Sequence, residues 1–303
     1  MMADAIPGKV AAIVVTRNRL RLLQENVAAV RSQTRAADEI IVVDNGSTDE
    51  TGTWLAAQPG LTVIRQGNLG GAGGFHTGIK AAYERGHDWF WCMDDDTIPC
   101  QDTLGRLLDS KWAANESTGF LNSLVHWTDG ENHPMNLPSV NCGTPLLLEC
   151  MQCNSLPIEN SSFVSMLVSR RAVEKCGLPL KEMFIWYDDV EYTRRMRRHF
   201  RGYLITDSIV VHATSTKHSP DTSELTEDNA VKYIHGLRNR MYLIMTSGGA
   251  LRHRLKAVFR EARMHHDLAK KRVSPQTVRR LDLAMLNGIF RFRPRIQFAE
   301  KDL

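Results

Sequence analysis

Short apolar runs alternate with segments of helical periodicity over the first hundred residues, and this alternation constrains the fold more than any other feature. Residues 10–15 and 39–43 are almost continuously apolar, which is typical of strands buried on both faces of a parallel sheet. Between them, Leu20, Leu23 and Val27 recur at the spacing of one helix face. Repeated strand–helix–strand units predict an α/β fold with a right-handed, doubly wound sheet, whose ligands bind beyond the carboxyl ends of the strands.

Further elements follow the same pattern up to residue 225. Strands are expected at 61–65 and 89–93, with helices at 49–57 and 75–85. The stretch 128–160 is rich in Pro, Asn, Gly and Ser and predicts a loop or hairpin. A helix at 188–200 and a strand at 203–211 come next, and the chain beyond residue 226 is mostly helical. We therefore expect a catalytic domain at 1–225, with halves at about 1–100 and 101–225, and a helical region at 226–303.

Composition excludes several protein classes. Gly is 21, Pro is 11 and 43% of residues are hydrophobic, which is incompatible with collagen-like or disordered chains. We expect no membrane-spanning helix, because no apolar run reaches roughly 18 residues. Six Cys without a dense framework suit a reducing cytoplasm. Residues 251–303 hold fourteen Lys and Arg against five Asp and Glu, so a basic end follows a mildly acidic body.

Three consecutive carboxylates, Asp94, Asp95 and Asp96, follow the apolar run at 89–93. Side chains two apart in a strand point the same way, so we expect Asp94 and Asp96 to converge while Asp95 faces elsewhere. Clustered carboxylates are costly to bury without a neutralising cation. Mg²⁺ or Mn²⁺ with oxygen ligands would neutralise them. The triplet therefore predicts a divalent metal site, with a solvated acidic turn as the alternative.

Two further features border the same sheet edge. Asp44 ends the second strand, where its carboxylate either accepts hydrogen bonds from a ribose or base or caps its own turn. A glycine-rich segment at 68–74 precedes the helix expected at 75–85. Glycines let a backbone approach a ligand closely, and a helix N-terminus favours anions. A flexible turn is the alternative, and the segment lacks the Lys-Ser/Thr of an ATP-binding P-loop.

A second acidic segment begins a later helix. Trp186 and Tyr187 precede Asp188 and Asp189, so one carboxylate either faces a pocket walled by aromatics and acts as a general base, or pairs with the helix dipole. His212 ends the last expected strand. It is either structural or completes the metal site of the aspartate triplet.

Together these residues resemble the inverting family 2 glycosyltransferases with the GT-A fold, and especially the bacterial galactofuranosyltransferases. Residues 14–19 and 41–47 resemble the family's two nucleotide-binding segments, and the triplet at 94–96 resembles its DxD element. Residues 68–75 and 186–191 are similar to further galactofuranosyltransferase segments, although Tyr187 here separates Trp186 from the carboxylates. The resemblance extends from about residue 10 to residue 242.

The resemblance implies a role for each site residue. Asp189 is expected to be the catalytic base. Metal binding is expected of Asp94, Asp96 and His212, and acceptor binding of Trp186, Tyr187, Asp188 and Glu191. Donor binding is expected of Thr16, Arg17, Asp44, Asn68, Gly70, Gly71, Gly73, Gly74 and Asp95.

The implied reaction is a single displacement with inversion at the anomeric carbon. Asp189 removes the proton of an acceptor hydroxyl as that oxygen attacks UDP-galactofuranose, and Mn²⁺ or Mg²⁺ stabilises the departing UDP. Related rhamnosyltransferases share Tyr233, Arg238 and Asn239 in a late helix, so a dTDP-rhamnose donor is the alternative. A nucleotidyltransferase is more distant. A non-catalytic sugar-binding module is disfavoured because metal carboxylates and a candidate base are both present.

The resemblance also implies partners. The acceptor is expected to be a polyprenyl-diphosphate-linked glycan used in cell-surface polysaccharide synthesis, which places the enzyme in the cytoplasm or on the inner membrane face. Leu251, Leu255, Val258 and Phe259, with basic neighbours, predict an interfacial helix for anionic lipid. The alternative is packing on the catalytic domain or a second subunit. Nucleic acid is not expected, because the basic residues lie outside any recognised binding module.

Overall fold

The computed structural model describes residues 8–140, 142–217 and 222–299. Its strands are β1 (Val10–Thr16), β2 (Glu39–Asp44), β3 (Thr62–Arg65), β4 (Trp89–Asp94), β5 (Thr97–Pro99), β6 (Thr118–His126), β7 (Ser155–Ile158), β8 (Met166–Ser169) and β9 (Arg201–His212). Its α-helices are α1 (Leu20–Arg31), α2 (Thr51–Ala56), α3 (Gly70–Glu84), α4 (Thr103–Asp109), α5 (Thr144–Met151), α6 (Arg170–Cys176), α7 (Asp188–Met196), α8 (Ala230–Thr246), α9 (Leu251–Ala269) and α10 (Pro275–Phe290).

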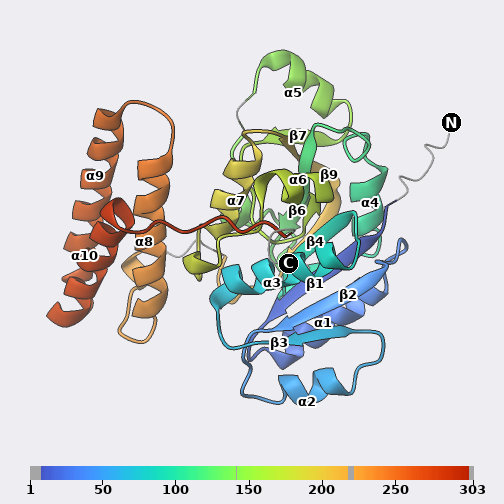
Figure 1. The fold of residues 1–303 in the computed structure, drawn as a ribbon, viewed down its shortest axis with the longest axis horizontal. Coiled ribbons are helices and arrows are strands. Elements are labelled where there is room, and N and C mark those ends of the chain that lie inside the picture. The colour runs from blue at the N-terminus through green and yellow to red at the C-terminus, as the bar shows by residue number, and fades with distance from the viewer. Residues whose placement is uncertain (1–7, 141, 218–221, 300–303) are drawn as a thin grey trace.

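All strands belong to one sheet, with the order β3-β2-β1-β4-β8-β6-β9-β5 and β7 paired to β9 (Figure 1). The first four strands in this order are parallel. Strand β8 runs antiparallel to both β4 and β6, whereas β6 and β9 are parallel again. The expected α/β class is confirmed, and the sheet is mixed beyond β4.

The sheet is covered by helices on both faces, as its apolar runs require. In β1, Val10, Ala12 and Val14 contact one core together with the apolar faces of α1 and α4. Ala11 and Ile13 contact a second core, built with α3, α6 and α7. Alternate side chains of one fully buried strand therefore contribute to two separate cores.

The structure differs from the sequence-based expectations at three elements. The stretch expected to be loop or hairpin contains α5 and β7. Pro145 lies in the first turn of α5, where its missing N–H costs nothing, so this proline begins a helix. Helix α3 begins at Gly70 and includes the glycines expected to precede it, whereas α7 ends at Met196 and not at residue 200.

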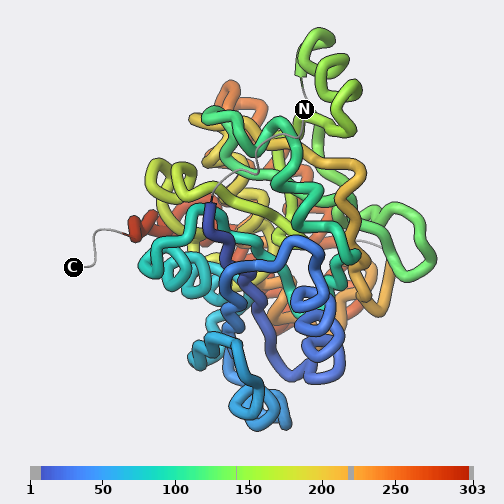
Figure 2. The backbone as a smooth tube through the Cα atoms, turned by 90° about the vertical axis from the view of Figure 1, so that its right-hand side faces the viewer, coloured from blue at the N-terminus to red at the C-terminus, as the bar shows by residue number. Residues whose placement is uncertain are grey.

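Helices α8, α9 and α10 pack around a core of their own, which includes Tyr233, Met241 and Leu281. They stand beside the sheet in Figure 1 and behind it in Figure 2. The chain after α10 returns to the catalytic part, where Gln297 O accepts a hydrogen bond from the Leu178 amide at 2.8 Å. Within the described residues, none of the helices is both long and apolar enough to cross a membrane. The division into units at residue 225 stays a prediction.

Candidate active site

Three strand ends meet at one edge of the sheet. Thr16 at the end of β1 pairs with Asp44 at the end of β2, and the preceding Val15 pairs with Asp94 at the end of β4. These three strands are parallel, so their carboxyl ends border the crevice where ligands of such sheets bind. Two predicted donor residues and one predicted metal ligand are therefore neighbours.

Asp95 is held by the loop that follows β1. Thr16 Oγ1 donates to its Oδ2 at 2.8 Å and the Arg17 amide donates to the same oxygen at 3.4 Å. Burial raises the pKa of Asp95 to about 6, although the nearby Arg19 lowers it. Residues 95 and 96 form a turn after β4, so the alternation expected of a strand does not describe their directions.

Asp96 and His212 are in contact, because β5 pairs antiparallel with β9 and Thr97 is opposite His212. His212 Nε2 lies 3.2 Å from Asp96 Oδ1, and both side chains are buried. Arg19 Nη1 donates to the other oxygen, Asp96 Oδ2. The structure thus brings the late histidine to the aspartate triplet.

Asn136 determines which ring nitrogen of His212 carries a proton. Its Nδ2 donates to Ser162 Oγ at 2.8 Å, so its Oδ1, at 2.9 Å from His212 Nδ1, is an acceptor for that nitrogen. In the neutral ring, Nε2 then presents a lone pair to Asp96 Oδ1, which is buried and has no hydrogen-bond partner. Two acceptors at this distance require a proton or a cation between them.

A divalent cation fits this set of donor atoms. The unpartnered Asp96 Oδ1 and the His212 lone pair are hard and borderline ligands of the kind that Mn²⁺ accepts. Burial, and then the charges of Asp96 and Asp95, raise the pKa of Asp94 well above its usual range, a cost that a bound cation would relieve. In the ranges that the structure describes, no group of three or more His, Cys, Asp or Glu side chains already stands at metal-binding spacing.

The second acidic pair lies across from the triplet, at the start of α7. Burial, followed by the charge of Asp189, raises the pKa of Asp188 to about 8. Burial raises the pKa of Asp189 to about 6, while the Val190 amide donates to its Oδ1 at 2.6 Å. The charge of Asp188 also contributes to the raised pKa of Asp94, so the two acidic groups are close enough to act on each other.

Glu191, a predicted acceptor residue, is paired within the fold. Its Oε2 lies 2.8 Å from Arg195 Nη2, and both side chains are buried. Arg195 also donates to the carbonyl oxygens of Cys176 and Leu178. This ion pair attaches α7 to the segment after α6, and no contact of Glu191 supports the acceptor role, which stays a prediction.

The aromatic side chains before α7 contact the C-terminal helices. Trp186 packs edge-to-face on Tyr233, with ring centroids 5.1 Å apart, and lies over Gly236 of α8. The hydroxyl of Tyr187 accepts a hydrogen bond from Arg240 Nη1 at 3.0 Å. Trp186 therefore packs on the core of α8–α10 and Tyr187 is held by α8, so the acceptor role of both residues stays a prediction.

Close packing explains two glycines of the segment expected to bind the donor. Gly70 has a φ of +73°, and a Cβ there would lie 1.9 Å from Phe184 O. A Cβ on Gly74 would lie 2.4 Å from the Val15 side chain, where α3 crosses β1. A Cβ on Gly73 would meet Leu69, whereas one on Gly71 would meet nothing within 4 Å. Among these glycines, Gly71 faces open space.

Asp44 and Asn45 shape the turn after β2. Asp44 Oδ1 accepts from the Ser47 amide at 2.9 Å, and its Oδ2 lies 3.2 Å from Arg65 Nε. Asn45 Nδ2 donates to Gly70 O at 2.8 Å, which attaches this turn to the start of α3. Asn68 Oδ1 accepts from the Gly70 amide at 3.0 Å.

Sequence reasoning missed several polar residues that assemble the site, because their partners are distant in the chain. Arg19 contacts two carboxylates of the triplet. Asn26 Nδ2 donates to Thr97 O at 2.6 Å and so supports the turn at Asp96. Asn136 lies in the stretch expected to be loop. The available signal was the run of Arg and Asn directly after β1, which we interpreted only as part of a nucleotide-binding segment.

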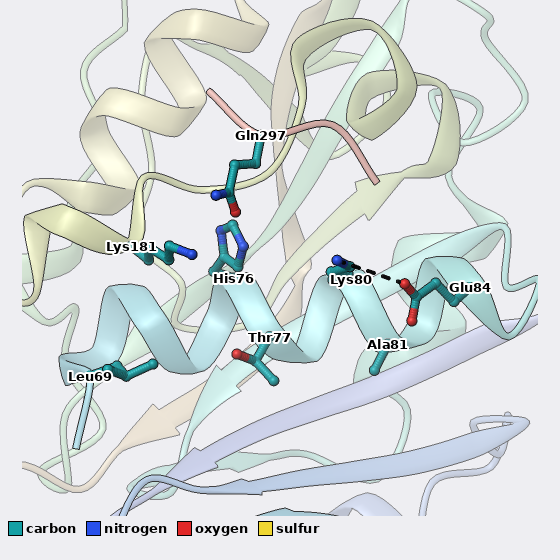
Figure 3. A pocket seen from close by; sticks show the side chains of 8 residues that line it. All are labelled: Leu69, His76, Thr77, Lys80, Ala81, Glu84, Lys181 and Gln297. Atoms are coloured by element: carbon teal, nitrogen blue, oxygen red, sulfur yellow. Dashed lines mark ion pairs between the residues drawn. The ribbon is translucent and has the colours of Figure 1, made fainter. Parts of the chain in front are cut away.

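A cavity of about 340 Å³ lies along the outer face of α3 (Figure 3). His76, Lys80 and Lys181 line it together with Gln297 from the returning C-terminal segment. The Lys80 ammonium is paired with Glu84 at 4.0 Å. None of the lining residues belongs to the acidic site, so this cavity is separate from the crevice at the strand ends.

The comparisons with known proteins agree with this geometry. Residues 11–141 match the model of the family described as "Glycosyl transferase family 2". The galactofuranosyltransferase GlfT1 of Mycolicibacterium smegmatis is 31% identical over 255 residues, which are 79% of this chain and 84% of that protein.

Solved structures share the fold at low sequence identity. The crystal structure of GalNAc-T7 with UDP, GalNAc and Mn²⁺ superposes with a TM-score of 0.60 at 12% identity, over 80% of this chain and 48% of that one. The mannosyltransferase PcManGT from Pyrobaculum calidifontis, in complex with GDP-Man and Mn²⁺, superposes with a TM-score of 0.55 at 18% identity, over 96% and 78% of the two chains. These structures are GT-A glycosyltransferases, so the expected GT-A fold is confirmed.

Proposed function

Because this chain belongs to glycosyltransferase family 2, we propose that it transfers galactofuranose from UDP-galactofuranose to a hydroxyl group of a glycan, with inversion at the anomeric carbon. The observation that carries the proposal is the arrangement of two acidic groups on one crevice. The Asp94–Asp96 turn lies beside His212, and Asp188, which precedes Asp189, is close enough for its charge to act on Asp94. The choice of sugar follows from the similarity to GlfT1.

Asp189 is the proposed general base. A base must be unprotonated at working pH and yet be basic enough to accept a proton. A pKa raised to about 6 by burial meets both conditions near pH 7. Its neighbour Asp188, with a pKa raised to about 8, is mostly protonated there. Asp188 can therefore donate a hydrogen bond to an acceptor sugar without adding a second negative charge.

Asp94, Asp96 and His212 are the residues that would hold Mn²⁺ or Mg²⁺. A bound divalent ion supplies Lewis-acid stabilisation of the charge that develops on the departing diphosphate. In the protein alone, Arg19 contacts both Asp95 and Asp96. Its guanidinium is half exposed, so it can turn from the carboxylates toward a phosphate, which it would bind through two parallel hydrogen bonds.

The donor nucleoside would lie over the ends of β1 and β2. Thr16, Arg17 and Asp95 form one wall through their mutual hydrogen bonds. Asp44 is the proposed partner of the uracil or ribose, and its ion pair with Arg65 would adjust when the nucleoside binds. Asn68 and the start of α3 form the opposite wall, where Gly71 leaves room for the donor.

The acceptor is proposed to be a lipid-linked glycan, and the outer face of α9 and α10 is the proposed membrane surface. His266 Nδ1 of α9 lies 3.0 Å from Asp282 of α10. Phe259 of α9 and Phe290 of α10 are 69% and 68% exposed, so each helix presents an aromatic side chain to solvent.

The same two helices are rich in basic residues. Residues 251–290 contain ten Lys and Arg and three Asp and Glu, and each basic residue near an anionic bilayer contributes about 1 kcal/mol. Val258, which we expected on this surface, is buried in the helical core.

Flotation with phosphatidylglycerol vesicles tests the proposed membrane surface. The double variant F259S/F290S should no longer float with the vesicles. The control L137S, which removes an exposed leucine elsewhere, should float normally. Recovery of the unmodified protein only in the soluble fraction would contradict the proposal.

A donor screen tests the reaction itself. Purified enzyme with Mn²⁺ and a glycan acceptor is incubated with UDP-galactofuranose or with dTDP-rhamnose, and the products are weighed by mass spectrometry. Addition of one galactofuranose with release of UDP is the expected result. Transfer of rhamnose alone would establish the alternative donor, and pyrophosphate release would indicate nucleotidyl transfer.

A further inference from the structure

The loop at 182–187, which we call the acid loop because it leads directly into Asp188 and Asp189, has an unusual backbone. Phe184, Trp186 and Tyr187 have φ angles of +66°, +63° and +67°. Non-glycine residues rarely adopt this region, and bulky aromatic ones persist there only when surrounding contacts hold them. The acid loop also precedes the carboxylates without a side-chain cap on α7. Something outside the loop must therefore maintain its conformation.

Asn239 of α8 supplies the principal contacts. It is fully buried, and its Nδ2 lies 2.8, 3.1 and 2.9 Å from the carbonyl oxygens of Met183, Ile185 and Trp186. Its two N–H groups serve three acceptors, so one N–H is shared between two carbonyls. One amide group thus contacts three carbonyls of a six-residue segment. The Met183 oxygen also accepts a hydrogen bond from the Ile185 amide at 2.8 Å, so loss of Asn239 would affect the carbonyls of Ile185 and Trp186 most. A buried carbonyl left without a donor is costly.

Arg238 fixes the orientation of that amide and adds hydrogen bonds of its own to the acid loop. Its Nε and Nη2 donate to Asn239 Oδ1 at 3.0 and 2.8 Å, so the amide can present only its NH₂ group to the acid loop. The same Nη2 donates to the carbonyl oxygens of Glu182 and Met183 at 2.7 and 3.1 Å. The guanidinium lies 4.0 Å from the centroid of Phe292 in the returning segment.

The acid loop is held from its opposite side by the start of α3. The Ala72 amide donates to Phe184 O at 3.2 Å, and Gly70 leaves space for the same carbonyl. The acid loop therefore lies between the helix proposed to border the donor and the helix that carries Asn239. A displacement of either side would move the two carboxylates.

We infer that Asn239, oriented by Arg238, is a positioning residue for the catalytic base: it holds the acid loop in the left-handed conformation that directs Asp188 and Asp189 into the crevice. The inference rests on the proposed function. It makes α8 a working part of the active site, although α8 follows the last strand of the sheet and contributes no residue to the acidic groups.

The test uses the full-length enzyme and two readouts. Asn239→Asp keeps the size and the Oδ1 acceptor but removes the NH₂ donors. We expect kcat to fall by about 10²-fold, the usual effect of misplacing a catalytic group by about 1 Å, while the affinity for UDP, measured by calorimetry, stays unchanged. Hydrogen–deuterium exchange of the peptide that contains the acid loop should become faster.

A pH profile separates positioning from a general loss of structure. Once the acid loop is released, Asp189 becomes more solvated, so the acidic limb of kcat/KM should move from about 6 toward the ordinary carboxylate range. Asn239→Leu is used for this profile, because it removes the NH₂ donors without adding a charge. Arg238→Met, which keeps the aliphatic stem over Phe292, replaces Asn239→Asp in these measurements if that variant does not fold. It should show the same limb shift and a smaller loss of kcat.

Val278→Ala is the matched control. Val278 of α10 is buried in the core of α8–α10, on which Trp186 of the acid loop also packs, but its apolar side chain has no part in the hydrogen bonds to the acid loop. This variant therefore loosens the helices and should keep kcat, the pH profile and the exchange rate. An equal loss of kcat in Val278→Ala, or unchanged exchange in Asn239→Asp, would overturn the inference. Absence of sugar transfer by the unmodified enzyme would instead refute the proposed function, and the exchange rates would still decide whether Asn239 holds the acid loop.

Discussion

The aspartates after β4 and the aspartates at the start of α7 have the same chemistry and opposite surroundings. Asp96 has Arg19 on one oxygen and His212 beside the other, and Asp95 accepts from Thr16. No ion pair reaches Asp188 or Asp189 within the residues that the structure describes, and burial raises both of their pKa values. Burial also raises the pKa values of Asp94 and Asp95, but the pKa of Asp96 is lowered, against the effect of burial, by the nearby His212 and Arg19. The first group therefore keeps a charged carboxylate where a cation would bind, whereas the second is arranged to exchange protons near neutral pH.

This contrast shows how one fold gives different tasks to identical side chains. The positive partners of the triplet come from elements far apart in the chain, the loop after β1 and the end of β9. The acid pair has peptide groups and apolar side chains around it instead, which favour the neutral carboxyl form. The following predictions test this division, starting from the largest expected effect.

Asp189→Asn should lower kcat by about 10³-fold, because general-base catalysis contributes roughly 10²- to 10⁴-fold. Binding of UDP and Mn²⁺ should be unchanged, since these ligands are proposed to bind at the other acidic group. Initial rates and calorimetry measure the two quantities. Near-native turnover of the variant would remove Asp189 from the mechanism.

His212→Ala should weaken Mn²⁺ binding in the presence of UDP by at least about 10-fold, comparable to the effect of losing a partner of a metal ligand. Electron paramagnetic resonance of free Mn²⁺ measures this affinity without any turnover. His199→Ala, which removes a histidine outside the site, is the control and should bind Mn²⁺ normally. Equal Mn²⁺ affinity in both variants would show that His212 is a structural residue.

The pH dependence of kcat/KM should report the acid pair. Asp189 must be unprotonated to act, and its pKa is raised to about 6, so kcat/KM should increase as the pH rises through about 6 and then level off. Initial rates at low substrate concentration are needed, because kcat/KM reports the pKa values of the free enzyme. An acidic limb near 4 would mean that the carboxylate is solvated.

Asp188→Asn should alter how stability depends on pH. The pKa of Asp188 is raised to about 8 by burial, so the folded protein binds a proton that the unfolded chain has lost, and stability falls as the pH rises from about 4 to about 8. The asparagine variant has no carboxyl group at this position, so its stability does not show this decrease with rising pH. Its stability relative to the unmodified protein should therefore increase by several kcal/mol across that window, since one pKa unit corresponds to about 1.4 kcal/mol, as measured by urea unfolding.

Asp228→Asn provides the reference for that measurement, because Asp228 is exposed. Its stability difference should stay constant over the same pH range. If the two variants behave alike, the acid pair is not desolvated, and the contrast between the two acidic groups fails.

The sequence predicted the parts of the fold that depend on local pattern. Continuous apolar runs located β1, β2 and β4, and the polar residues after them marked the edge where the site lies. The contact between Asp96 and His212 depends on the pairing of β5, a strand of three residues, with β9. Such a short strand has no periodicity to detect, so the sequence suggested the partners through family resemblance and not through their geometry.

Two other features could not be predicted for identifiable physical reasons. Glycine weakens isolated helices, so a run of glycines argued against the helical turn that begins at Gly70, where close packing on Phe184 and Val15 requires the absence of side chains. An asparagine within a helix carries no signal of what it binds. The contacts of Asn239 with three distant carbonyls become apparent only when α8 lies against the acid loop.

The hydrogen bonds of Asn239 end on main-chain oxygens, so side chains of the acid loop can be substituted without removing these hydrogen bonds. A grip on the peptide backbone does not depend on which side chains that backbone carries, so Ile185 and Tyr187 can be exchanged while the three carbonyls stay bound. Randomised libraries at these two positions are therefore a rational way to alter which acceptor the enzyme uses. Trp186 is best left unchanged in such libraries, because its ring rests on Gly236.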